Sequence, residues 1–180
     1  MSTFAISRPT SDEAAPFYHS YIAEVAGENI TEQLADQLGE VEELFGSLDD
    51  TAALARYAAG KWSVKEVLGH LTDAERIFGY RLLRIARGDR TPLPGFDENA
   101  YVPAGRFDSR PLRSLMDEFR SVRLSTLAMI QGLPLEGWTR RGEASGLPIS
   151  ARALAYIIPG HVSHHLGVLR DRYGLGATAR

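Results

Sequence analysis

The chain has 180 residues, a net charge of −3, 44% hydrophobic and 24% charged residues, and no cysteine. These values are typical of one globular domain that is long enough to bury a core. Charges of both signs are scattered, which argues against a nucleic-acid partner, and no apolar run approaches the ~20 residues that span a bilayer. The N-terminus lacks the charged and then apolar pattern of a secretory signal, so we expect one cytoplasmic domain over residues 1–180.

The absence of cysteine restricts the chemistry of any functional site. Disulfides, thiolate metal ligands and a cysteine nucleophile are all excluded. A transition-metal site would therefore have to use histidine, aspartate or glutamate side chains.

The first third of the chain predicts two helices. Residues 1–15 are interpreted as an extended lead-in, and a short N-terminal helix follows over 16–26, since Pro16 suits a first helical turn. We interpret His19 on this helix as an ordinary surface or packing residue. A long helix near 30–48 has acidic residues around an apolar stripe of helical spacing. That stripe consists of Ile30, Leu34, Leu38, Val41, Leu44 and Phe45.

A third helix is predicted near 64–87. Ser63 is a good N-cap, and Glu66 three residues later completes the pattern of a capping box. His70 borders the apolar stripe of this helix. Three arginines follow toward its end, and we interpret them as a solvated face, with one of them as an alternative contact for an anionic substrate. They are Arg81, Arg84 and Arg87.

Residues 89–108 are predicted to form a long loop that is rich in proline and glycine. A loop of this length in a compact domain is usually functional or mobile, and the alternative is a solvated connector. Four polar or aromatic residues on it could reach the mouth of a site: Asp97, Glu98, Asn99 and Tyr101.

The remaining chain predicts helices near 110–131 and 150–173. Asp108 or Ser109 is the expected cap of the first, and Ser150 is the expected cap of the second, which Pro159 would bend. Between them, residues 133–148 contain a weak signal for a strand or hairpin. The tail, 174–180, is expected to be frayed.

Four long amphipathic helices with almost no period-two alternation predict an all-α fold, an antiparallel four-helix bundle with an extra N-terminal helix. The long 89–108 connection permits a crossover between helices that are not simple up-down neighbours. Metal sites in such bundles are built from side chains on facing helices.

Three of the five histidines lie between Ile157 and Val168. On a helix, His161 and His165 are one turn apart on the same face, which also carries apolar residues. Together with His70 from another helix they would provide three nitrogen ligands and leave a coordination position open. This arrangement suits a divalent metal in a catalytic or ligand-binding site.

Other interpretations of the histidines stay open. They could be hydrogen-bonded core residues without a metal, and His164 competes with His165 as a ligand. The apolar residues Val168 and Leu169 favour His165, so we place His164 beside the ligands or at the rim of the site. Asp73 could orient an imidazole or bind a water molecule, or it could be a solvated helix residue. A zincin-type protease is excluded, because Val162 stands where its glutamate would be.

Three segments of the chain resemble the DinB-like superfamily, and most closely its YfiT-like, DinB_2 branch. They are Lys-Trp-Ser at 61–63, Val-Leu-Gly-His-Leu-Thr-Asp-Ala-Glu-Arg at 67–76, and Gly-His-Val-Ser-His-His-Leu at 160–166. The segment 8–22 resembles the lead-in helix of that branch, so the resemblance covers nearly the whole chain.

The resemblance implies an up-down-down-up bundle with one nickel or zinc ion held by three histidines, which map onto His70, His161 and His165. It also implies a homodimer. Some members are assigned as metal-dependent hydrolases, and others transfer low-molecular-weight thiols such as bacillithiol, mycothiol or glutathione. The sequence departs from the family at Val162 and Leu169, where members often carry an acidic residue and a glutamine.

Three functional hypotheses follow. The first is a metal-dependent enzyme, either a hydrolase or a thiol S-transferase acting on a small molecule, for which Arg81 and the acidic 97–99 segment are the candidate substrate contacts. The second is a non-catalytic metal- or ligand-binding dimeric bundle. The third is an interaction module without a metal.

Overall fold

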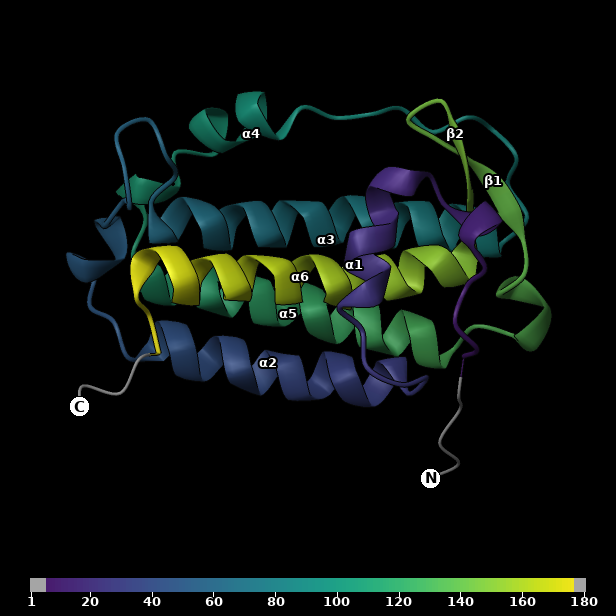
Figure 1. Cartoon of the computed structure of the whole chain (residues 1–180), viewed down its shortest axis with the longest axis horizontal. Helices are drawn as coiled ribbons and strands as arrows, with labels where there is room; N and C mark the ends of the chain where they lie inside the picture. The colour runs from purple at the N-terminus through teal and green to yellow at the C-terminus, as the bar shows by residue number, and fades with distance from the viewer. Residues whose placement is uncertain (1–5, 177–180) are drawn as a thin grey trace.

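The computed structural model describes residues 6–176 and is dominated by a four-helix bundle (Figure 1). Its long helices are α2 (Ile30–Gly46), α3 (Val64–Ala86), α5 (Leu112–Gln131) and α6 (Ala151–Tyr173). Both α2 and α3 pack against α5 and α6, so α2 and α3 occupy one diagonal of the bundle. Helices α2 and α6 run in one direction and α3 and α5 in the other, which confirms the up-down-down-up arrangement.

The connection from α3 to α5 crosses the length of the bundle, and it corrects one expectation. Residues 89–108 are predicted as a long loop, but they contain the helix α4 (Glu98–Gly105), and a short 3-10 turn, Phe107–Ser109, begins at their end. Asp97 caps α4 by accepting a hydrogen bond from the backbone nitrogen of Asn99 at 2.9 Å. The buried Phe107 then lies so close to α3 that a β-carbon at Gly69 would be 2.4 Å from its ring.

Three helix starts follow the local capping signals in the sequence. Ser63 and Glu66 form the predicted capping box of α3, with both reciprocal hydrogen bonds present. The side chain of Ser150 accepts from the backbone of α6, as predicted, and Asn29 does the same for α2. The start of α5 differs, because the side chain that caps it lies far away in the sequence. Asp50 accepts from the backbone nitrogen of Leu112 at 2.7 Å, instead of Asp108 or Ser109.

The N-terminal helix is shorter than the predicted 16–26. A 3-10 turn, Pro16–Tyr18, leads into α1 (His19–Ala23), and another turn, Ser11–Glu13, interrupts the extended lead-in. In Figure 1, α1 lies across α6, against which it packs. The predicted lead-in residues 1–5 lie outside the described part of the chain.

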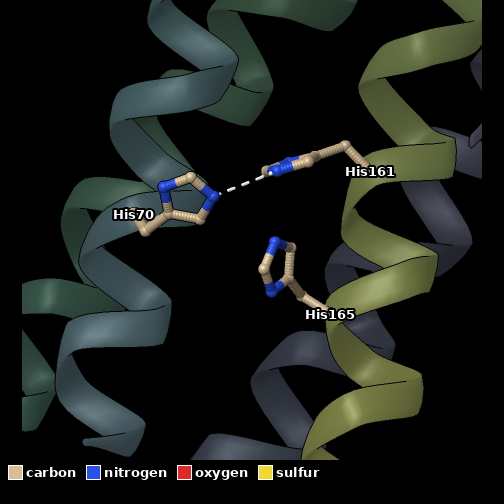
Figure 2. Close-up of side chains that lie close together, drawn as sticks. All are labelled: His70, His161 and His165. Carbon is tan, nitrogen blue, oxygen red and sulfur yellow. Dashed lines mark hydrogen bonds between the residues drawn. The ribbon is translucent and has the colours of Figure 1, made fainter. Parts of the chain in front are cut away.

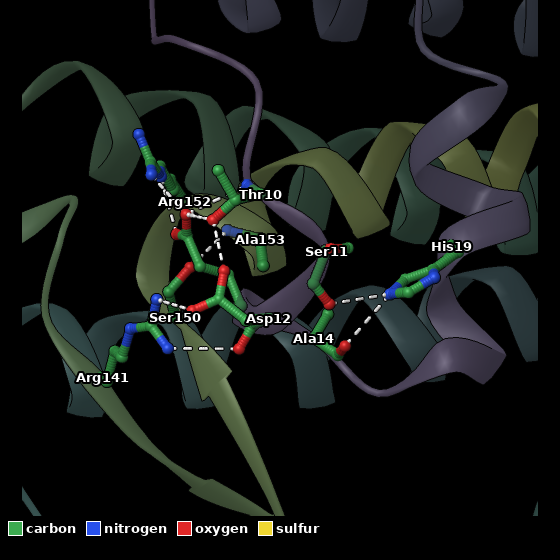
Figure 3. A network of polar contacts seen from close by, with 10 residues as sticks. Thr10, Ser11, Asp12, Ala14, His19, Arg141, Ser150, Arg152 and Ala153 are labelled. Atoms are coloured by element: carbon green, nitrogen blue, oxygen red, sulfur yellow. Dashed lines mark hydrogen bonds and ion pairs between the residues drawn. The ribbon is translucent and has the colours of Figure 1, made fainter.

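Side-chain contacts hold the N-terminal segment against the start of α6 and the neighbouring hairpin (Figure 3). Asp12 pairs with Arg141 at 2.7 Å, and Glu13 accepts a hydrogen bond from Nε of Arg152 at 2.6 Å. His19 Nε2 lies 3.1 Å from the carbonyl oxygen of Ser11, so this histidine connects the start of α1 to the earlier of the two 3-10 turns that precede it.

The weak strand signal in 133–148 is confirmed as an antiparallel hairpin of β1 (Arg141–Ala144) and β2 (Leu147–Ser150). Its two-residue turn has positive φ at both Ser145 (56°) and Gly146 (75°), the geometry of the tight hairpin turns that suit twisted strands.

The end of α6 is an ordered cap. Gly174 adopts the left-handed conformation, and the backbone nitrogen of Leu175 bonds to the carbonyl oxygen of Leu169 at 3.2 Å. The frayed tail expected over 174–180 stays a prediction beyond this cap, and 177–180 lie outside the described residues. None of the described helices is long and apolar enough to cross a membrane.

Candidate metal centre

Three imidazoles meet where α3 packs against α6 (Figure 2). His70 comes from α3, and His161 and His165 come from successive turns of α6. One ring nitrogen from each histidine lies within 4.8 Å of the other two, and Nε2 of His70 is 3.1 Å from Nε2 of His161. The structure therefore brings together the three predicted ligands.

The donor set fits a divalent transition metal. Nitrogen ligands at ~2.0–2.1 Å in tetrahedral geometry lie about 3.3 Å from one another, and the His70–His161 nitrogens are already near that separation. Imidazole nitrogens are good ligands for zinc and nickel. Three donors leave a position for a further molecule, as in catalytic sites.

Burial keeps these imidazoles neutral. It lowers the pKa of His70 to about 4, and together with the neighbouring His70 and His164 it lowers the pKa of His165 to about 3. Burial also holds the pKa of His161 well below its ordinary value. Each ring therefore carries an unprotonated nitrogen near pH 7, which is the form that binds a metal.

The histidines border a cavity of about 440 Å³, a size typical of small-molecule sites. The ring of Trp62 lies 4.8 Å from that of His70, and the rings of Tyr21 and Phe78 lie 5.3 and 5.6 Å from that of His161. The remaining apolar wall comes from the N-terminal segment, the segment before α4 and the hairpin. It includes Phe17, Tyr18, Phe96, Ala144 and Leu147.

The other histidine of the motif lies at the edge of this cavity. His164 is exposed, its ring is 5.4 Å from that of Tyr21, and it is outside the close group of three ring nitrogens. This position agrees with the expected place of His164 beside the ligands or at the rim.

Asp73 lies away from the cavity. Its carboxylate is 3.6 Å from Nη1 of Arg76, which also pairs with Glu118 at 2.7 Å. Asp73 is not among the residues that line the cavity, so the structure places it in a surface ion-pair cluster and not beside the imidazoles.

Arg81 corrects the interpretation of a solvated arginine face. Its side chain is buried and lines the same cavity as the histidines, whereas Arg84 is partly exposed and pairs with Asp89. Within the 97–101 group, Glu98 also lines the cavity, while Asp97 caps α4.

Several cavity residues were not predicted. Phe78 follows His70 by eight positions on α3. Arg81, which was predicted as a candidate substrate contact, follows His70 by eleven positions, a step that returns to the same helix face. No comparable signal connects Tyr18, Tyr21 or Ser145 to the histidines, because these residues reach the site only through the tertiary fold.

A four-helix bundle that presents three clustered histidines to a cavity defines a class of candidate metal-binding helical proteins. The family model of the DinB superfamily matches residues 33–169, and the chain belongs to this superfamily. No curated protein is similar enough in sequence to count as a match.

Solved structures share this fold at low sequence identity. YfiT from Bacillus subtilis, described as a probable metal-dependent hydrolase with an unusual four-helix bundle topology, aligns with a TM-score of 0.66 and 17% identity over 93% of this chain and 94% of its own. A DinB-like protein from Bacillus cereus aligns at 0.60 and 16%, over 85% and 96%.

A larger relative is the mycothiol-dependent maleylpyruvate isomerase, with a TM-score of 0.67 and 12% identity. The alignment covers 87% of this chain but only 64% of the isomerase.

Proposed function

We propose that this protein binds one divalent metal ion, nickel or zinc, through His70, His161 and His165, and that it is a metal-dependent enzyme acting on a small organic molecule. The observation that carries the proposal is the convergence of three ring nitrogens, from two buried histidines and one partly buried histidine, within 4.8 Å at the wall of a cavity of about 440 Å³. A metal needed only for stability would have no need of such a cavity.

A divalent metal in this position would supply Lewis acidity and lower the pKa of a bound water or thiol. Burial by the protein's own side chains favours the neutral form of the imidazoles, and aromatic rings line the cavity beside them. Among the described lining residues Glu98 is the single carboxylate, so it is our candidate for accepting a proton from the incoming nucleophile.

Hydrolysis and thiol transfer are the two reaction types that we propose to compare. The first is supported by the shared fold with YfiT, described as a probable metal-dependent hydrolase, and the second by the mycothiol-dependent isomerase. Since the chain has no cysteine, the thiol would have to be a separate low-molecular-weight cosubstrate.

The test begins with metal analysis of protein purified without a histidine tag. One nickel or zinc ion per chain is the expected result, and a folded protein that takes up no metal would contradict the proposal. The metal-loaded protein is then screened with low-molecular-weight thiols and electrophiles, and in parallel with esters and amides. Stoichiometric metal without turnover in either screen would favour the alternative, a non-catalytic metal-binding bundle.

The homodimer stays a prediction. Three large apolar side chains on α3 and α5 are exposed in the single chain, Tyr80, Leu83 and Leu124, and they are candidates for contact with a second copy. Light scattering at micromolar concentration is expected to give twice the mass of the chain, and the mass of one chain would contradict the prediction.

A further inference from the structure

Two arginines of the bundle have almost no exposed surface, but their surroundings differ. Arg123 (0% exposed) forms a bidentate ion pair with Glu75. Arg81 (1% exposed) forms no ion pair with any carboxylate in the described part of the chain. A buried charge without a counterion is costly, because it has lost its hydration and gained no opposite charge.

The contacts of Arg81 are all with neutral groups. Its Nη2 donates to the carbonyl oxygen of Pro94 at 2.7 Å and to Oγ of Ser145 at 3.0 Å. Its Cζ lies 5.8 Å from the centre of the Phe96 ring. The arginines before and after it on α3, Arg76 and Arg84, both have carboxylate partners. Among the three arginines within α3, the one that faces the cavity is therefore the one without a counterion.

Arg81 and the candidate metal ligands border the same cavity, at different levels along α3. Eleven residues separate His70 from Arg81, a rise of about 16 Å between their α-carbons, and the two share a helix face. Of the described residues that line the cavity, Arg81 is the single one with a permanent positive charge.

The wall between these two levels is largely apolar. The ring of Phe78 lies 5.6 Å from that of His161 and 6.3 Å from that of Tyr18, and Leu147 from the hairpin also lines the cavity. A molecule that occupies the cavity is therefore expected to have an apolar body, with a negative group at the level of Arg81 and its reacting group near the imidazoles.

We propose that the cavity accepts an organic carboxylate with an apolar or aromatic body, and that Arg81 binds its carboxylate. The planar guanidinium matches a carboxylate in geometry, and the bound carboxylate would supply the missing counterion. Binding at this distance from the reacting group would position the substrate without taking part in bond making. The inference rests on the proposed function for the reacting end, but the arginine site can be tested without a metal.

The first experiment uses the full-length, metal-free wild-type protein at a pH of about 8, where the low pKa values of His70, His161 and His165 keep these three imidazoles neutral. Benzoate, phenylacetate, 3-phenylpropanoate and 4-phenylbutanoate are titrated by calorimetry against their primary amides, which have the same shape without the charge. At least one acid is expected to bind about tenfold more tightly than its amide, and added salt should weaken this preference. Equal binding of acids and amides, or binding of none of the acids, would overturn the proposal.

Variants then locate the carboxylate. Arg81→Met keeps the apolar stem and is expected to abolish the preference for acids, whereas Arg81→Lys should retain part of it. Arg84→Met is the matched control on the same helix and should behave as the wild type, because Arg84 does not line the cavity. Glu98→Gln removes the negative charge of the cavity and should tighten acid binding, because less repulsion then acts on the bound carboxylate.

The outcomes separate the two proposals. If Arg81→Met does not fold, the comparison of acids with amides on the wild type and on Arg81→Lys still decides. Acid binding that survives in Arg81→Met would overturn the arginine site. Acid binding that depends on Arg81, in a protein that takes up no nickel or zinc, would overturn the proposed metal-dependent function. The same result would support the carboxylate site.

Discussion

The carbonyl oxygen of Tyr21 lies directly over Gly160, so close that a β-carbon at this position would be 1.9 Å from it. Tyr21 belongs to α1, and its ring packs edge-on against His161 and His164. The glycine therefore allows α1 to rest on α6 and to close one side of the cavity.

Gly160→Ala is expected to displace α1 and to destabilise the protein by about 1–3 kcal/mol, the usual cost of overpacking a well-packed contact. The clash is with backbone, which a change of rotamer cannot relieve. Chemical denaturation measures the loss. Gly167→Ala on the same helix is the control. It meets nothing within 4 Å and should stabilise the helix by about 0.5–1 kcal/mol. Equal effects of both variants would contradict this account of the contact.

The ion pair between Glu13 and Arg152 predicts a pH-dependent contribution to stability. Burial alone would raise the pKa of Glu13, but hydrogen bonds from Arg152 and Thr10 outweigh it and hold the pKa well below the ordinary 4.5. A carboxylate with a lowered pKa stabilises the folded state above its unfolded pKa, and this contribution is lost as the pH falls toward the folded pKa.

We therefore expect the wild type to be more stable than Glu13→Gln near pH 7, and the difference to shrink as the pH falls below about 4.5. Denaturation midpoints of both proteins across the acid range provide the measurement. A difference that stays constant down to low pH would show that the lost contact is not ionic.

The buried pair of Glu75 and Arg123 links all four long helices. Nη1 of Arg123 also donates to the carbonyl oxygen of Leu34 at 3.0 Å and to Oε1 of Gln37 at 3.1 Å, and Gln37 donates to the carbonyl oxygen of Pro159 at 2.9 Å. Glu75→Gln leaves the buried guanidinium without its counterion and should cost about 3–5 kcal/mol in the free energy of unfolding.

The matched control for this pair is Glu42→Gln, since Glu42 on α2 forms a more exposed ion pair with Arg120 on α5, the helix that also carries Arg123. Exposed pairs contribute only about 0–1 kcal/mol. Urea denaturation of the two variants is expected to show a several-fold larger loss for Glu75→Gln. A loss as small as that of the control would mean that the buried network does not depend on charge.

The four long helices could be predicted because their signals are local. The capping box of Ser63 and Glu66 needs only residues three positions apart, and an apolar stripe repeats within one segment. The start of α5 could not be predicted in the same way, since its cap is Asp50 from a distant part of the chain. Helix α4 is short and contains Pro103, so it has too little periodicity to stand out.

The same distinction applies to the site. The spacing of His161 and His165 placed both on one helix face, and the apolar surroundings of His70 indicated a matching position on a second helix. The aromatic wall depends on contacts such as that of Tyr21 with Gly160, which only the folded chain creates. Asp73 was considered because it is near His70 in sequence, but it faces Arg76.

The identity of the metal ligands is the central claim, and metal titration of four single variants tests it most directly. His70→Ala, His161→Ala and His165→Ala each remove one of three nitrogens that lie within 4.8 Å of one another. Each is expected to reduce the affinity for nickel or zinc sharply, while His164→Ala, at the exposed rim, should have a smaller effect. Loss of binding in His164→Ala together with retained binding in His165→Ala would contradict the account.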